Sequence, residues 1–277
     1  MEIPKIIFQY QHILTDYRNA TTIYMNELHR LFSEEKTMLN TEDDWRLVMQ
    51  SNEDYASKMF DKARQIIKQT VDLAESAFAG DAGKLSIDGN PYVDFFIGLE
   101  GRNYTLRNEK VMELNIVDVW AKLETDYGNG KGEVKAYAQY ANKIIRAFNL
   151  RQNDEIKIIG GNIVLEKTMY LDSIDKKFGN NRYSYSCKDE MIVLLSSLNK
   201  FFTWAGKEDY IHPTDLISNK LNESRRVVEP REKFVISDEL YFITMNSKLD
   251  FRFSQSLGFL LQQFVTEFGE LLLAKAA

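Results

Sequence analysis

The spacing of the apolar residues changes near residue 150, and this change limits what the chain can fold into. Before it, apolar residues recur every three or four positions, which is typical of helices that bury one side. From about Glu155 they alternate with polar residues, which is typical of strands with one buried face. We therefore predict an α+β protein, with a mainly helical region over 1–150 and an α+β region over 151–277 in which β-hairpins pack against helices.

A long amphipathic pattern over about 4–39 opens the chain. Pro4 suits the first turn of a helix, because the N–H that proline lacks would have no partner there. Phe8 and Ile23 lie off the apolar stripe of this helix. We predict that the stripe is buried, and it consists of Ile6, Ile7, Tyr10, Ile13, Leu14, Tyr17, Tyr24, Leu28, Leu31 and Phe32.

Further helical patterns fill the rest of the first region. A capping box at 41–44 predicts the start of a short helix, and Asn52 is placed to cap the next helix, which ends at Gly80. Two more patterns cover about 106–127 and 133–148.

Two hairpins are predicted in the second region. Residues 155–167 alternate around a Gly160-Gly161 turn, and residues 241–253 alternate around a short polar turn. A lone hairpin is marginally stable in water, so its apolar face needs a cover. The closing helix can supply one, because its apolar residues recur at helical spacing from Leu257 to Leu272.

Four large apolar residues lie outside the predicted core stripes. Phe259 and Leu273 fall on the polar side of the closing helix, and Phe8 and Ile23 fall off the stripe of the first helix. Single exposed apolar side chains are common, and a helix can also be covered on both faces within one chain. Since burial of such side chains is favourable, they are our candidates for a surface that binds a protein partner or another copy of the chain.

Charge and cysteine content narrow the class of protein. The net charge of −6 argues against a surface built for nucleic acid, and one cysteine excludes an internal disulfide, which fits a reducing compartment. No apolar run approaches the roughly 20 residues of a membrane-spanning helix, and the first residues lack a leader pattern. We expect a cytoplasmic protein that does not enter a membrane.

The sequence contains no recognisable catalytic motif. His12 and His29 are seventeen positions apart on one predicted helix, so about 25 Å separates them and they cannot share a metal ion. Cys187 lies at a predicted helix start without a histidine beside it as a base. The glycine-rich runs at 80–86 and 128–132 lack the spacing or context of a phosphate loop.

A nuclease-like hairpin is also disfavoured. Asp154, Glu155, Glu166 and Lys167 have suitable side chains for a metal-dependent nuclease. Glu166 and Lys167 are adjacent, however, so strand alternation points them to opposite faces. We therefore predict no catalytic, cofactor-binding or metal-binding residues, and we expect a protein that is not an enzyme.

One segment, residues 176–188, resembles a single-strand nucleic-acid binder in composition. Cations that bind phosphate are interleaved with aromatic rings that can stack on bases. Asp172, Asp175 and Asp189 dilute the positive charge, and a strand edge with one buried and one solvated face explains the same pattern. The candidate residues for nucleic acid are Lys176, Lys177, Arg182, Tyr183, Tyr185 and Lys188.

Three stretches together carry a family resemblance over about half of the chain. RYSYSCKDEMIVLLSSLNKFF reads as an aromatic strand with a capped helix, and ELYFITMNSKLDFRFSQSLGFLLQQF reads as a strand pair with an apolar helix. TDYRNATTIYMNEL reads as an N-terminal helix with an Arg-Asn pair. This order resembles a domain-of-unknown-function family carried by phages, prophages and conjugative elements, some of whose members are joined to adenine DNA methyltransferase domains. The resemblance implies a mobile genetic element and brings no functional residues with it.

Together these observations predict a non-enzymatic protein-interaction factor of a phage or mobile genetic element. More specifically, we expect that the protein inhibits a host defence complex by binding it and that it forms homo-oligomers. We expect it to act in the cytoplasm of a bacterial host cell. The alternative is a nucleic-acid-associated accessory protein that binds single strands through residues 176–188.

Overall fold

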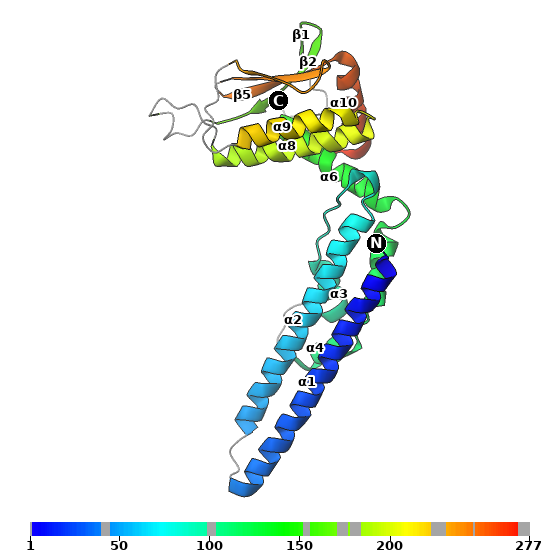
Figure 1. Ribbon diagram of the computed structural model, residues 1–277, viewed down its shortest axis with the longest axis vertical. Coiled ribbons are helices and arrows are strands. Elements are labelled where there is room, and N and C mark those ends of the chain that lie inside the picture. The colour runs from blue at the N-terminus through cyan, green and yellow to red at the C-terminus, as the bar shows by residue number, and fades with distance from the viewer. Residues whose placement is uncertain are drawn as a thin grey trace. The chain divides into compact units, whose positions relative to one another are not determined.

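The computed structural model of the chain describes residues 2–39, 45–98, 104–151, 156–170, 177, 184–222, 231–245 and 247–270. For the helical residues 35, 36, 38, 39, 45–54, 56, 104–108, 185, 221 and 222 it describes the backbone alone. The first half is helical and the second half contains a five-stranded antiparallel sheet with helices packed on it, so the predicted α+β fold is confirmed (Figure 1).

The chain divides into two compact units. Unit 1 comprises Met1–Phe78 and Ser86–Lys131, and unit 2 comprises Ala79–Leu85 and Gly132–Ala277. The predicted boundary at 150 marks the point where strands begin, and the compact units do not follow it. Nearly all of helix α6 (Lys131–Phe148) belongs to the unit that contains the sheet, because its apolar side helps to cover that sheet.

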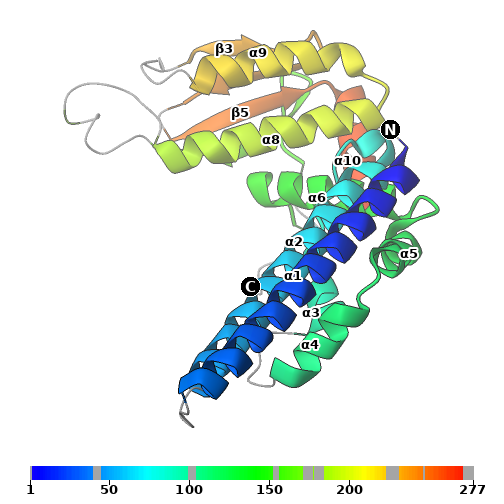
Figure 2. The same ribbon diagram turned by 60° about the horizontal axis from the view of Figure 1, so that its bottom comes forward.

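Unit 1 is built on a long helical hairpin. Helices α1 (Ile3–Leu39) and α2 (Trp45–Ala77) lie side by side (Figures 1 and 2). At 1.5 Å per residue, α1 is about 55 Å long. The shorter helices α3 (Asn90–Ile97), α4 (Tyr104–Glu113) and α5 (Ile116–Tyr127) pack along this hairpin. The core between them includes the buried side chains of Leu14, Ile66, Ile67, Ile97, Ile116, Val119 and Leu123.

The structure corrects the predicted helix start at Asn52. Helix α2 runs without a break from Trp45 to Ala77, so Asn52 lies inside it. Asparagine costs only a few tenths of a kcal/mol in a helix interior, and the apolar side of α2 buries Met59 and Phe60 in the following turns. Packing therefore outweighs the preference of asparagine for a helix end. The predicted capping box at 41–44 lies outside the described residues.

Unit 2 contains the sheet, in which both predicted hairpins are found. Its strands are β1 (Ile158–Ile159), β2 (Asn162–Thr168), β3 (Lys233–Val235), β4 (Leu240–Thr244) and β5 (Lys248–Phe253), in the order β1-β2-β5-β4-β3. The hairpins join through β2 and β5, which pair from Ile163 opposite Phe253 to Thr168 opposite Lys248. Gly160 and Gly161 form the first turn with φ of 59° and 80°, a conformation that glycine adopts without strain.

One face of the sheet is aromatic and is covered by helices. Phe234, Phe242 and Phe251 stack across three neighbouring strands, with 4.8 Å between ring centroids in each pair. Phe148 of α6 meets the Phe251 ring edge-on at 5.2 Å. The helices α8 (Tyr185–Trp204) and α9 (Ile211–Asn222) lie side by side in Figure 1, and they are joined by the short helix η2 (Glu208–Tyr210).

Helix α10 (Gln255–Phe268) is shorter than the sequence predicted. Gly269 ends it with an extended backbone, and the N–H of Gly269 donates to the carbonyl of Val265. A Cβ at this glycine would lie 2.3 Å from Cδ1 of Ile145, so the backbone passes close to α6. Residues 271–277 lie outside the described residues, and the predicted position of Leu273 falls among them.

Candidate interaction surfaces

One row of side chains provides the buried contacts of helix α1 with unit 1. Ile7, Leu14 and Met25 of this row are buried. Gln11 accepts a hydrogen bond from the backbone N–H of Ile116 at 2.8 Å, and Arg18 donates to the carbonyls of Val111 and Leu114 at 2.5 and 2.7 Å. The positions of this inner row repeat every seven residues, as in a helix that packs along its length against others. The inner row consists of Ile7, Gln11, Leu14, Arg18, Thr21, Met25, Leu28 and Phe32.

A second row with the same period lies one residue earlier, about 100° around the helix. Tyr24 is 60% exposed, Ile13 and Leu31 are each 47% exposed, and Ala20 is exposed. Toward the start of the helix, Tyr17 is half-buried and has Nζ of Lys62 6.0 Å from its ring centre. We call this second row the tyrosine row, and it consists of Ile6, Tyr10, Ile13, Tyr17, Ala20, Tyr24, Glu27, Leu31 and Glu34.

The structure thus divides the apolar stripe that the sequence predicted for this helix. Ile7 and Leu14 are buried as predicted, but Ile13, Tyr24 and Leu31 are exposed. The prediction was wrong for these three residues because it merged two rows about 100° apart into one side. The sequence did contain a signal for the division: apolar residues repeat every seven positions in two registers that differ by one residue.

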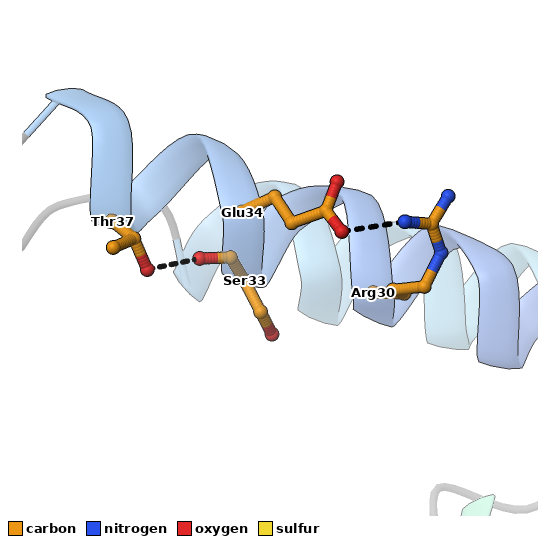
Figure 3. Close-up of a pocket in the computed structure, with 4 residues that line it drawn as sticks. All are labelled: Arg30, Ser33, Glu34 and Thr37. Carbon is orange, nitrogen blue, oxygen red and sulfur yellow. Dashed lines mark hydrogen bonds and ion pairs between the residues drawn. The ribbon is translucent and has the colours of Figure 1, made fainter.

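Charges of both signs flank the tyrosine row. Nδ1 of His12 lies 3.3 Å from the Asp16 carboxylate, and Arg30 pairs with Glu27 and Glu34, each at 2.5 Å. The hydrogen bond from Arg30 lowers the pKa of Glu27. Figure 3 shows a shallow hollow at the ion pair of Arg30 with Glu34. Arg30, Ser33, Glu34 and Thr37 line this hollow.

Both residues of α1 that the sequence singled out are accessible. Phe8 and Ile23 are each 69% exposed. On a helix with 3.6 residues per turn, Ile23 flanks the tyrosine row beside Tyr24, whereas Phe8 lies on the opposite side of the helix from this row. The structure therefore does not place the two residues on one surface.

Phe259 lies on the outer side of α10 and is 58% exposed. It lines a shallow hollow with Gln262, Gln263, Thr266 and Glu267. The inner side of the same helix holds the buried residues Leu257, Leu261, Phe264 and Val265. Phe259 therefore projects away from the core as predicted.

The segment predicted for nucleic acid lies mostly outside the described residues. Lys176, Arg182 and Tyr183 belong to that part, and only the backbone of Tyr185 is described, as the first residue of α8. Lys177 is exposed and Lys188 is half-buried. The described residues of this segment therefore leave the nucleic-acid hypothesis as a prediction.

Glu239, just before β4, is the centre of a polar cluster that sequence reasoning missed. Its Oε2 accepts hydrogen bonds from Nζ of Lys207 at 2.7 Å and from the hydroxyl of Tyr210 at 2.6 Å. Its Oε1 accepts from the hydroxyls of Ser254 at 3.1 Å and Ser256 at 2.7 Å. These donors, Lys207 above all, lower the pKa of Glu239 to about 2. The carboxylate joins η2, the strand β4 and the start of α10, so we interpret its role as structural.

The charged residues of the first hairpin are paired on opposite faces of the sheet. On the face away from the aromatic rings, Glu166 pairs with Lys157 at 2.5 Å and with Lys248 at 2.8 Å. Lys167 is buried on the other face and pairs with Glu190 of α8. The predicted alternation of Glu166 and Lys167 is therefore confirmed. Asp154 and Glu155 lie outside the described residues.

The side chain of Cys187 is enclosed by the fold. Cys187 is buried, and its Sγ accepts a hydrogen bond from the backbone N–H of Tyr170 at 3.2 Å. In the part of the chain that the structure describes, no three His, Cys, Asp or Glu side chains are grouped so that they could hold a metal ion.

Comparison of the chain with protein-family models, with curated proteins and with solved structures finds no match. The membrane prediction can be compared with the helices directly. Within the described ranges, every helix is too short or too polar to cross a membrane.

Proposed function

We propose that this protein acts by binding other proteins, as a non-enzymatic interaction factor of a phage or mobile genetic element. The observation that carries the proposal is the exposure of large apolar side chains on helices whose inner sides are already packed. Phe259 on α10 and Ile23 and Tyr24 on α1 are each more than half exposed. Each of them can be buried by a partner without any change in the fold, and such burial contributes about 1.5–3 kcal/mol per side chain.

The proposed target is a host defence complex that the protein inhibits. The support for this target is the resemblance of the C-terminal half to a family carried by phages and conjugative elements. The hollow around Phe259 supplies a suitable anchor site, because an exposed aromatic ring is surrounded there by amide, hydroxyl and carboxylate side chains. Aromatic anchors with a polar rim are typical of protein interfaces.

A capture experiment in bacteria that carry defence systems tests this proposal. Tagged protein is recovered from these cells, and co-purified proteins are quantified by mass spectrometry. Phe259→Glu places a charge in the proposed anchor site, so we expect it to reduce recovery of the partner by at least about tenfold. Leu216→Glu is the matched control, because Leu216 on α9 is 56% exposed and Phe259 is 58% exposed.

The same variants are then tested for phage plating on these cells. We expect the wild type and Leu216→Glu to restore plating and Phe259→Glu to fail. The proposal is contradicted if no other protein is recovered in an amount that rises with the amount of tagged protein. It is also contradicted if Phe259→Glu recovers the same partner as well as the wild type does.

A further inference from the structure

We infer that the tyrosine row of α1 binds the tyrosine row of a second copy of this chain, with the two helices antiparallel. This inference rests on the proposed function, since it identifies one protein partner as the chain itself. Helix α1 has two rows of period seven. The inner row packs in unit 1, whereas the tyrosine row is half-buried at Ile6, Tyr10 and Tyr17 and exposed from Ala20 to Glu34. A row of period seven is the pattern by which one helix packs along another.

The row is complementary to itself when the second copy runs in the opposite direction. In the register that places Ala20 opposite Tyr24 of the second copy, a small side chain faces a large one. The same register places Ile13 opposite Leu31, so the exposed apolar residues meet one another. Because the pair is symmetric, each of these contacts occurs twice.

The polar residues of the row also find partners in this register. Tyr17 lies opposite Glu27 of the second copy, and Tyr10 lies opposite Glu34. A tyrosine hydroxyl donates a hydrogen bond to a carboxylate, which makes both of these pairs favourable. Tyr10 and Tyr17 lie in the first half of the row and both glutamates lie in the second half, so an antiparallel pair brings them together.

The flank of the row carries complementary charges. Asp16, Ile23 and Arg30 each precede a tyrosine-row residue by one position, and Asp16 and Arg30 have exposed side chains. In the antiparallel register, Asp16 lies opposite Arg30 of the second copy, and Ile23 lies opposite itself at the two-fold axis. The 69% exposure of Ile23 is explained if this side chain lies at the centre of the contact.

Parallel helices are disfavoured by the same residues. A parallel pair would place Glu27 against Glu27, Glu34 against Glu34 and Arg30 against Arg30. Like charges held opposite one another are repulsive and select against that arrangement. The antiparallel pair instead brings Tyr10 of the second copy to Glu34, beside the hollow in Figure 3.

The first test compares two substitutions on the same helix. Ile23→Glu places two carboxylates opposite one another at the axis, and we expect the dissociation constant of the dimer to rise at least about tenfold. Phe8→Glu is the matched control, since both side chains are 69% exposed and Phe8 lies on the opposite side of α1. Sedimentation equilibrium over a range of concentrations measures the mass, and circular dichroism confirms that each variant is folded.

The second test exchanges charges between copies. Asp16→Arg and Arg30→Asp each create two repulsive pairs in a homodimer, and we expect each to weaken self-association about tenfold or more. In an equimolar mixture, both pairs are attractive again, so the two variants should form a mixed dimer. Recovery on mixing also shows that each variant is folded.

The inference is overturned if the wild type has a mass of 32.3 kDa at all concentrations. It is also overturned if Phe8→Glu dissociates the dimer as strongly as Ile23→Glu does, or if the mixture of charge variants remains monomeric. Failure of the proposed function gives a different result. In that case, the dimer forms and responds to Ile23→Glu, but the cells contain no partner that depends on Phe259.

Discussion

The carboxylate of Glu239 accepts hydrogen bonds from four side chains, and this makes stability depend on pH. Its pKa falls from an ordinary value of 4.5 to about 2, and Lys207 is the largest cause. Because the folded-state pKa is the lower one, the stabilisation is fully present above about pH 4.5. It is lost as the pH falls from there toward 2.

We predict that Glu239→Gln lowers the free energy of unfolding at pH 7 by about 1–2 kcal/mol, after allowance for solvent screening. The variant should also lose the part of the acid dependence that lies between about pH 4.5 and 2. Urea unfolding at a series of pH values measures both effects. Glu267→Gln, at an exposed position on α10, is the control and should retain the acid dependence. Equal pH profiles for Glu239→Gln and the wild type would contradict the assigned cluster.

At the scale of elements, α10 meets the sheet through Gly258. A Cβ at this position would lie 2.5 Å from Cδ1 of Ile163 on β2 and 3.3 Å from its Cβ. Alanine favours a helix over glycine by about 1 kcal/mol, whereas overpacking costs about 1–3 kcal/mol. Since Ile163 is itself buried, we expect the overpacking to be the larger effect.

We therefore predict that Gly258→Ala lowers the free energy of unfolding by about 1 kcal/mol in spite of its helix propensity. Ile163→Val removes Cδ1, so the double variant should be more stable than the sum of the two single effects predicts. Chemical denaturation of the four proteins measures this coupling. If Gly258→Ala stabilises the protein, the close contact between α10 and β2 is not as described.

Several elements could be predicted from the sequence because their patterns are long or have specific turn residues. The alternation over 241–253 and the Gly160-Gly161 turn predicted the two hairpins that the structure contains. Strand β3 has only three residues, which is too short for a period of two to be recognised. The close approach of Gly269 to α6, where α10 ends, depends on tertiary contact and leaves no local pattern.

The candidate surface could be predicted only in part. Phe8, Ile23 and Phe259 are exposed, as their positions off the core stripes suggested. Tyr24 and Leu31 were assigned to the core, because a wide apolar side does not reveal which part of it neighbouring helices will cover. The covered part is set by tertiary contacts, such as those of Gln11 with Ile116 of α5 and of Arg18 with the carbonyls of Val111 and Leu114.

At the scale of the whole molecule, the exposed tyrosine row of α1 allows two copies of the chain to assemble. The two compact units have separate cores, and the tyrosine row belongs entirely to unit 1. Association through this row uses residues of unit 1 alone, whereas the sheet and Phe259 belong to unit 2 of each copy. A dimer would present two such sites at once, which can raise the apparent affinity for a multivalent target.

The most direct test of the antiparallel register measures distances between spin labels by pulsed electron paramagnetic resonance. Nitroxides are attached to cysteine introduced at position 8 or 26 of α1, in a Cys187→Ser background. With 1.5 Å per residue and a two-fold axis near Ile23, the two labels at position 26 should lie within about 25 Å of one another. The labels at position 8 should lie about 45 Å apart. Short distances at both positions would contradict the antiparallel register, and the absence of dipolar coupling at both would contradict self-association through α1.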